Sequence, residues 1–399
     1  MQIYTFGKRR IDQRIVTTKN SGQAIIDYDI DNAYPQRLRS YVERSGTLTK
    51  CIRRYAKHII GRGFVDTSFF GTIINNKGET ADDLLRLSVE RDFSHFKGVA
   101  WHVRYNANFQ SIEVNYLNYD HCRLGLPDDF GNIAKIAVYD DWDRKFYKVL
   151  KTRQIKYYDT FNPSPKVIAE QVNNAGGWDK WQGQVFYTSI RGIEYQKAVF
   201  DAIINDAIAD AGLSEFDVTS VMSDFSAKMA YSHPTALGDV TTQNGNTERQ
   251  NKLEELEEFT GPDGGRVFVI ENAQQGYDYL KPILVPDTDK RYEQTNDRIN
   301  NRIRTFFNIP PILVGEDISQ GLGSNDAMGN AFKFYNENTF DERYMVERIF
   351  QRVFSLWHTD ISPTNDFSIR PLLWQEPKIE VTNTTDTTTD TTNGTTTNQ

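Results

Sequence analysis

Apolar residues recur at helical spacing along much of the chain, and one region alternates them with polar residues instead. Predicted helices cover 47–60, 81–96, 193–211, 247–259, 287–307 and 326–357. From Val99 the period changes to two, which predicts strands at 99–105, 112–116, 120–125, 133–139, 145–150 and 154–158. Further strand-like runs occupy 218–222, 266–270 and 277–284. This pattern predicts an α+β protein whose strand region is antiparallel.

The stretch from Asn308 to His358 carries the clearest sequence of signals. Pro310 and Pro311 end the preceding helix because proline fixes φ and has no backbone donor. A glycine-rich segment with two acids follows at 315–324, and about 30 residues without proline then predict a long helix. By composition the segment 315–324 is an ordinary connector, but loops of this length between two helices are often functional.

Two predicted helices have apolar faces suited to packing against other helices. The helix at 287–307 has a narrow apolar seam on an otherwise polar surface, which favours contact with a neighbouring helix. The helix at 193–211 has a broader apolar face and Gly212 at its expected end. The residues predicted to pack these helices are Phe200, Ile203, Ile204, Ile208, Tyr292, Ile299, Ile303 and Phe306.

Charge and composition narrow the classes of protein. The 399 residues include 46 basic and 54 acidic side chains, a net charge of −8, which argues against a DNA-binding domain with one dominant basic surface. Cys51 and Cys122 are the only cysteines and lack metal-ligand spacing, so disulfide scaffolds and zinc sites are not expected. No apolar run approaches 18 residues, so we expect a soluble protein made in the cytoplasm, with no membrane partner.

Catalytic motifs find little support. Asp129-Phe-Gly131 matches a kinase metal motif in letters, but it lies in a turn between predicted strands, without a phosphate loop or catalytic loop. The six histidines are scattered, and no nucleophile motif is present. We therefore expect no enzymatic activity, cofactor or metal. A nuclease using carboxylates and a metal remains the rival from the enzyme class.

The predicted helix at 247–259 is strongly acidic. Its carboxylates are interpreted first as a solvated face, and alternatively as a surface that docks a basic partner. The residues of this candidate partner surface are Glu254, Glu255, Glu257 and Glu258.

Taken in order, these elements resemble the portal proteins of tailed bacteriophages. The most specific match is Phe306-Phe-Asn-Ile-Pro-Pro-Ile-Leu-Val-Gly315, followed by Ser324-Asn-Asp-Ala327, Phe332 and Thr339-Phe340. Weaker matches are the first helix with its ending Gly61-Arg-Gly-Phe64, and the stretch Ser94–Val103. Two departures stand out: Asp326-Ala replaces an expected glutamate, and little chain follows Trp374, where larger portals have a helical crown.

The resemblance implies a domain order for the chain. It assigns an N-terminal segment at 1–46, an α+β wing at 47–190, stem helices and connections at 191–231 and 286–308, a clip at 232–285, a tunnel loop region at 309–325, a long tunnel helix at 326–358, a reduced crown at 359–381 and a disordered Thr/Asn-rich tail at 382–399. Residues of the implied channel loop are Glu316, Asp317, Ile318, Ser319, Gln320, Leu322, Ser324 and Asn325.

By the same resemblance the function would be that of a portal. Such proteins form a ring, usually of twelve subunits, at one capsid vertex of the virion, and double-stranded DNA enters and leaves through its channel. The implied partners are further copies of the chain, the major capsid protein, the terminase and a head–tail adaptor. The alternative within phage structural proteins is an adaptor or minor head protein, which would normally lack the Pro-Pro, loop and long-helix unit.

Overall fold

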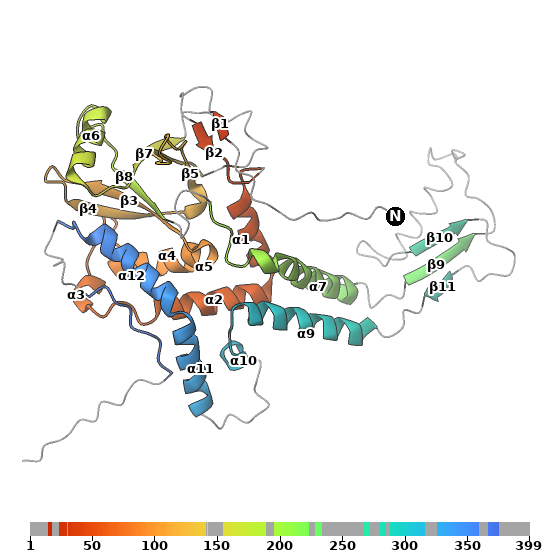
Figure 1. Ribbon diagram of the computed structural model, residues 1–399. Helices are drawn as coiled ribbons and strands as arrows, with labels where there is room; N and C mark the ends of the chain where they lie inside the picture. Colours follow the sequence, from red (N-terminus) through yellow and green to blue (C-terminus); the bar gives the residue numbers. More distant parts are fainter. Residues whose placement is uncertain are drawn as a thin grey trace, which may run out of the picture.

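The computed structural model forms a mixed helical and stranded body from which a pair of helices projects (Figure 1). This agrees with the predicted α+β class. The described residues are 15–17, 24–29, 31–140, 142, 155–188, 195–222, 228–233, 267–271, 280–283, 288–315, 325–358 and 366–374. We call the helix pair, α7 (Ile204–Met222) and α9 (Thr288–Phe306), the arm.

Among the described residues, the body contains a six-stranded sheet in the order β4-β3-β8-β7-β6-β5. Its strands are β3 (Val99–Tyr105), β4 (Ser111–Leu117), β5 (Cys122–Leu124), β6 (Lys135–Val138), β7 (Lys156–Thr160) and β8 (Gln184–Thr188). Neighbours pair antiparallel, as expected, except that β7 and β8 are parallel. The sheet is therefore mixed, because α6 (Pro165–Ala175) connects β7 to β8 as a crossover.

Helices pack against this sheet through a continuous apolar core. The chain elements around it are α1 (Tyr34–Arg44), α2 (Gly46–Ile60), α3 (Thr67–Phe70), α4 (Ala81–Ser88), the π-helical turn η1 (Val89–Phe93), α5 (Ser94–Phe96) and the 3-10 turn η2 (Tyr119–His121). Trp101 on β3 contacts Phe350 and Phe186, at ring-centroid distances of 4.8 and 5.8 Å. A small hairpin of β1 (Ile15–Thr17) and β2 (Ala24–Ile26) meets the β5 edge through the Ile25–Gly125 bridge.

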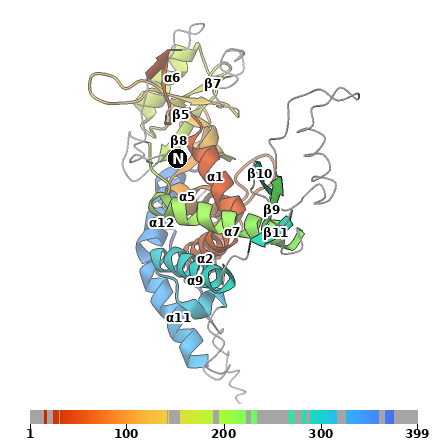
Figure 2. The same cartoon turned by 90° about the vertical axis from the view of Figure 1, so that its right-hand side faces the viewer.

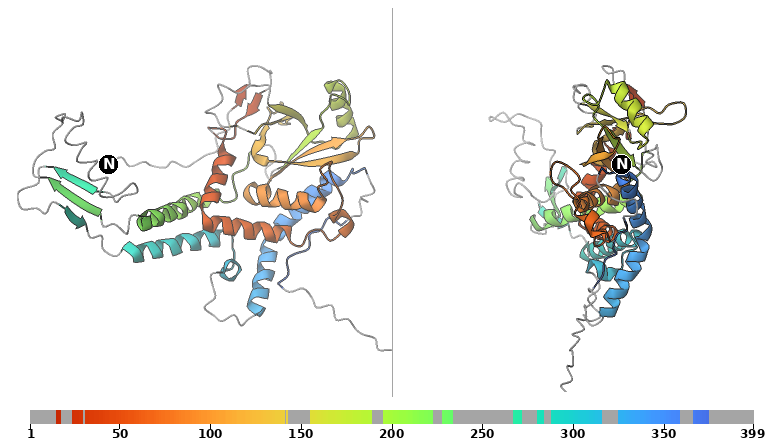
Figure 3. Two further views of the ribbon diagram at one scale, coloured as in Figure 1. Left: turned by 180° about the vertical axis from the view of Figure 1, so that it is seen from behind. Right: turned by 90° about the vertical axis from the view of Figure 1, so that its left-hand side faces the viewer.

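The C-terminal part of the described chain runs along one side of the body. After α10 (Pro311–Val314) come α11 (Asn325–Asn338) and α12 (Phe340–Phe354), which follow one another down that side in Figure 2 and in the right panel of Figure 3. The predicted single helix is thus two, separated at Thr339. The Thr339 hydroxyl donates to the Tyr335 carbonyl at 2.9 Å and accepts from buried Arg343 at 3.0 Å.

The arm extends away from the body, and α7 and α9 lie side by side in all views (Figures 1 and 3). A small sheet at its far end has the order β10-β9-β11, made of β9 (Lys228–His233), β10 (Val267–Glu271) and β11 (Leu280–Ile283). Strands near β10 and β11 are predicted correctly, whereas no strand is predicted at β9.

Two body helices contradict the sequence interpretation, and proline explains both. No helix or strand is predicted at 1–46 or 159–183, yet α1 begins at Tyr34-Pro35 and α6 begins at Pro165. Proline at the first helical positions costs no hydrogen bond, because those amides lack an intrahelical partner anyway. The pattern Asn162-Pro-Ser-Pro165 is therefore a helix start rather than a loop.

The helix expected at 193–211 is wrong in position, and the strand expected at 218–222 is wrong in type. The described residues 195–200 are not helical, because they bond to the body: Val199 N–H donates to the His95 carbonyl at 2.8 Å, and the Tyr195 hydroxyl donates to the Ile26 carbonyl at 2.7 Å. A 3-10 turn, η4 (Asp201–Ile203), leads into α7, which continues through Gly212 to Met222. The predicted strand at 145–150 and helix at 247–259 lie outside the described residues.

Candidate arm interface and channel segment

The base of the arm is held by apolar and polar contacts with the body. Ile203, Ile204, Ile299 and Ile303 are all buried. Asp210 of α7 accepts hydrogen bonds from the Ser45 hydroxyl at 2.6 Å and the Thr47 amide at 3.2 Å. Because Ser45 also caps α2, through Leu48 N–H at 3.1 Å, this contact ties the arm to a helix start of the body.

The outer half of the arm differs from its base in the burial of its side chains. None of the described side chains from Gly212 to Val218, or from Tyr292 to Arg298, is buried. The main contact there is a stack of Phe216 on Tyr292, with centroids 4.4 Å apart and planes at 11°. Such a ring pair contributes about 1 kcal/mol beyond its buried area, which is little for a projecting helix pair. This half of the arm therefore has surface available for a partner.

Large apolar side chains on the arm face solvent. Phe216 and Val218 are 44% and 55% exposed, and Ile208 and Phe306 are 38% and 37% exposed. Exposed apolar side chains occur on the body as well, for example Phe130 and Phe334, but those of the arm lie on two helices that carry few buried residues.

The predicted packing residues thus divide into three groups. Ile203, Ile204, Ile299 and Ile303 are buried where the arm meets the body, and Tyr292 is half-buried on Phe216. Ile208 and Phe306 point out of the single chain. Phe200 lies ahead of α7 and is buried in the body, 6.0 Å from the His95 ring, so it is not an arm residue.

A groove of about 730 Å³ runs along α9. We call it the α9 groove; its lining residues are Ile203, Asp206, Gln294, Asp297, Arg298, Asn301, Arg302, Thr305 and Phe306. The α9 members recur every three to four residues, so they share one helix face. Arg302 pairs with Asp206 at 3.3 Å across the groove, and Ile203 and Phe306 supply its apolar side chains.

The backbone around the Pro-Pro pair reverses direction sharply. Asn308 has φ +51°, Pro311 begins α10, and Gly315 ends it at φ +84°. Buried Ile309 and Leu313 hold this turn against the body. Figure 1 shows α10 beside α11 on the underside of the body.

The expected channel loop itself lies outside the described residues. Glu316, Asp317, Ile318, Ser319, Gln320, Leu322 and Ser324 belong to this stretch, and Asn325 is the first residue of α11. The acidic partner surface of Glu254, Glu255, Glu257 and Glu258 is outside the described residues as well.

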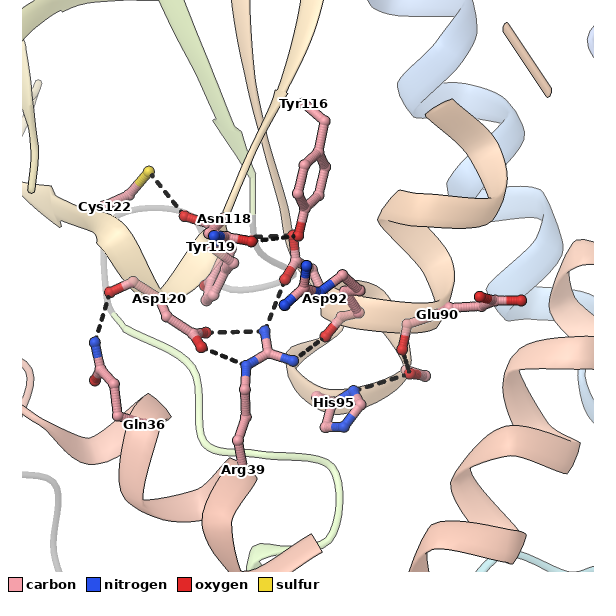
Figure 4. Close-up of polar contacts among 12 residues, drawn as sticks. Gln36, Arg39, Glu90, Asp92, His95, Tyr116, Asn118, Tyr119, Asp120 and Cys122 are labelled. Atoms are coloured by element: carbon pink, nitrogen blue, oxygen red, sulfur yellow. Dashed lines mark hydrogen bonds and ion pairs between the residues drawn. The ribbon is translucent and has the colours of Figure 1, made fainter. Parts of the chain in front are cut away.

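A buried charge network of titratable side chains lies in the body (Figure 4). Arg39 of α1 binds Asp92 of η1 at 2.7 Å and both carboxylate oxygens of Asp120 in η2, one of them at 2.9 Å. Its guanidinium also donates to the Arg91 carbonyl and lies 5.3 Å from the Phe96 ring. One side chain thus joins three elements that are distant in sequence.

The electrostatics of this network suit a structural role. Burial raises the pKa of the Asp92 carboxyl to about 7, against the opposing effect of Arg39. Burial lowers the pKa of His95 to about 3 and raises that of the Cys122 thiol, so neither is a proton carrier or nucleophile near neutral pH. The described residues contain no group of three His, Cys, Asp or Glu side chains that could hold a metal ion. In the described part of the chain no helix is long and apolar enough to cross a membrane.

Sequence reasoning missed the outer part of α7. Gly212 looks like a helix end, but its φ is not positive and the helix continues past it. Leu213 and Phe216 continue the apolar period, and this signal could have extended the helix. The residues of the α9 groove lie on the polar face of a correctly predicted helix, where periodicity gives no information about partners.

No family model matches the chain, and no curated protein matches it. Solved structures that resemble it include the neck of a native gene transfer agent particle, computed with C12 symmetry, with a TM-score of 0.48 and 13% identity over 86% of each chain. The virion of the native particle gives a TM-score of 0.45 and 12% identity, over 86% of this chain and 82% of that one. An HK97-family phage portal protein from Corynebacterium diphtheriae gives 0.38 and 7%, over 78% and 90%. At this level of similarity, function has to be inferred from the chain's own residues and contacts.

Proposed function

We propose that the chain is a portal-type head–tail connector. Copies of it stand side by side in a ring at one capsid vertex, and double-stranded DNA passes through the central channel. In this arrangement the body is the wing, the arm is the stem, the segment 232–285 is the clip, and 309–325 is the channel loop. The protein acts as a conduit and has no catalytic step of its own.

The arm is the observation that carries the proposal. A two-helix element that buries no side chain at 212–218 or 292–298, and which exposes Ile208, Phe216 and Val218, needs lateral neighbours to cover it. A ring of arms supplies such neighbours on both sides, whereas a single partner on one side leaves the other side open. The motif from Phe306 to Gly315, which resembles the portal family, lies directly after this arm.

The composition of the channel loop is consistent with passage of DNA. Each phosphate contact made by a basic residue adds salt-dependent affinity and would slow the moving duplex. The segment from Glu316 to Ser324 contains no basic residue, and it includes Glu316 and Asp317. Carboxylates repel phosphates, and the amide and hydroxyl groups of Gln320 and Ser319 bind them only weakly.

The implied partners follow from the same arrangement. The wing faces the major capsid protein, and the clip, with Glu254, Glu255, Glu257 and Glu258, meets the terminase and afterwards a head–tail adaptor.

Negative-stain electron microscopy of the purified full chain tests the proposal. We expect ring-shaped particles with a central hole, and mass photometry should give one mass at a multiple of the chain mass near twelve. A monodisperse monomer that cleaves DNA when a divalent metal is added would contradict the proposal and favour a nuclease. A closed ring that forms only with a second phage protein would favour the adaptor class.

A further inference from the structure

The two helices of the arm carry opposite charge. Between Ile204 and Met222, α7 has four carboxylates (Asp206, Asp210, Glu215 and Asp217) and no basic residue. Helix α9 has five basic residues against three acidic ones. A contact of α7 with another α7 would bring like charges together, whereas α7 against α9 of another copy brings unlike charges together.

The exposed side of α7 forms a ridge. Asn205, Ile208, Gly212 and Glu215 are all exposed and recur every three to four residues, so they share one face, which we call the α7 ridge. The ridge is about 15 Å long at 1.5 Å per residue. A side chain built on Gly212 would meet no atom within 4 Å, so another helix can approach the backbone closely at this point.

The ridge and the α9 groove face different directions. Ile208 lies roughly 160° around α7 from Asp206, the α7 residue that lines the groove. From Gln294 to Thr305 the groove runs about 17 Å along α9, which matches the length of the ridge. One side of the arm is therefore convex with an exposed isoleucine, and the other is concave with Ile203 and Phe306 in its wall.

We propose that the α7 ridge of one copy seats in the α9 groove of the next, with Ile208 inserted between the groove side chains. Of the four α7 acids, Glu215 is the one on the ridge, where it also pairs with Arg44 of its own chain, and it then faces Arg298 of the neighbour. Asp206 lines the groove, and Asp210 is buried against Ser45 and Thr47. The groove is lined by two acids, Asp206 and Asp297, and two bases, Arg298 and Arg302. Because Arg302 pairs with Asp206 in the same chain, Arg298 is the main attractive group. This inference rests on the ring proposed above.

The contact is directional, and this determines what it builds. Each copy uses its ridge toward one neighbour and its groove toward the other, which is a head-to-tail contact. Such contacts close into a ring when the rotation between copies divides a full turn. A contact between identical surfaces would instead stop at a dimer.

Two variants break opposite halves of the contact. Gly212→Gln fills the close approach on the ridge, and it removes a glycine from a helix interior, so the folded chain should not be weakened. Arg298→Glu reverses the charge in the groove. Ser214→Gln is the matched control, because Ser214 is exposed on the same helix but outside the ridge. We expect each of the first two variants to lower the ring fraction at least tenfold, and the control to keep rings.

Mixing the two defective variants gives the sharpest result. The intact groove of the Gly212→Gln chain can still accept the intact ridge of the Arg298→Glu chain, so mass photometry should show 1:1 dimers and no rings. Rings formed by either variant alone at the wild-type level would overturn this contact while leaving the portal proposal in place. Monomers alone and in the mixture would overturn the head-to-tail pairing, and a wild-type chain that forms no ring would overturn the proposed function itself.

Discussion

The body and the arm use the same kinds of residue in opposite ways. In the body, aromatic rings are buried against each other: Phe350 is fully buried and contacts both Phe64 and Trp101 with ring centroids within 5 Å. In the outer arm the comparable ring, Phe216, has one stacking partner and is 44% exposed. Charges differ in the same way, because Arg39 is enclosed by Asp92 and Asp120 whereas Arg298 and Arg302 line an open groove.

This difference indicates which part of the molecule is stable as a single chain. The body buries a continuous apolar core and the Arg39 charge network, although it also exposes apolar side chains such as Phe130 and Phe340. The stability of that core belongs to the single chain. The arm leaves apolar surface and unlike charge on two helices, so part of its stability must come from association. Substitutions should therefore separate cleanly: body changes lower the free energy of unfolding, and arm changes lower assembly.

The largest expected effect is in the body core. Phe350→Ala removes a ring packed between helix and sheet, and it should lower the free energy of unfolding by about 3–5 kcal/mol. Phe340→Ala on the same helix is the matched control, because Phe340 is 56% exposed and should cost well under 1 kcal/mol. Urea unfolding followed by circular dichroism measures both. Similar losses for the two variants would mean that the core assignment of α12 is wrong.

Sequence periodicity predicts much of this body, and the helix that it misses has a physical explanation. Helix α2 and strands β3 and β4 are predicted within a residue of their bounds, because their apolar spacing is regular and Gly61 ends α2. Helix α1 is missed because one of its inward side chains is Arg39, whose charge is matched by Asp92 and Asp120 from segments 53 and 81 residues away. No local pattern encodes such a partner.

The candidate site is less predictable than the fold. The narrow seam of α9 indicates a neighbouring helix, and Ile299 and Ile303 are indeed buried. The helix expected to face it was placed about ten residues too early, because residues 195–200 bond to the body and resemble a helix only in their apolar content. Whether Ile208 faces the chain's own core or another copy depends on tertiary placement, which periodicity does not contain.

The next largest effect is a change in the pH dependence of the free energy of unfolding. Because the folded chain holds the Asp92 proton to about pH 7 and the unfolded chain releases it near pH 4, this group lowers the free energy of unfolding as pH rises through that range. The slope for one proton is at most about 1.4 kcal/mol per pH unit. Asp92→Asn should remove this contribution, so the free energy of unfolding of the variant should rise relative to that of wild type between about pH 4 and about pH 7.

Other groups also contribute to the pH dependence of wild-type stability. The quantity to measure is therefore the difference in the free energy of unfolding between wild type and Asp92→Asn. Burial lowers the pKa of His58 to about 4 and of His95 to about 3, and these groups contribute the opposite slope below their ordinary value of 6.5. Asp83→Asn is a control of opposite sign, because hydrogen bonds from Thr80 lower the pKa of Asp83 and its stabilisation is lost as pH falls. Equal pH profiles for wild type and Asp92→Asn would show that Asp92 stays ionised with Arg39.

A smaller effect is expected in the outer arm. Phe216→Ala removes the stack with Tyr292 and should cost about 1 kcal/mol or less in the unassembled chain. When it is measured in the Gly212→Gln variant, which is designed to remain monomeric, this loss in the free energy of unfolding contains no contribution from assembly. A loss comparable to that of Phe350→Ala would mean that the arm has a core of its own and would remove the contrast with the body.

The smallest effect on folding is expected from the channel segment. Replacing Glu316–Ser324 with a short Gly-Ser linker leaves α10 and α11 in place, and both ends of the segment lie on the same side of the body. The free energy of unfolding and the ring mass should therefore stay within error of wild type, while capsids assembled with the variant should package or retain less DNA. The matched control, Glu316→Gln with Asp317→Asn, keeps the length and removes only the charge. If the control impairs DNA passage as much as the replacement does, the loop acts by repelling phosphate. If only the replacement impairs DNA passage, the loop acts through its length or shape. Loss of the ring in either variant would show that the segment is structural instead.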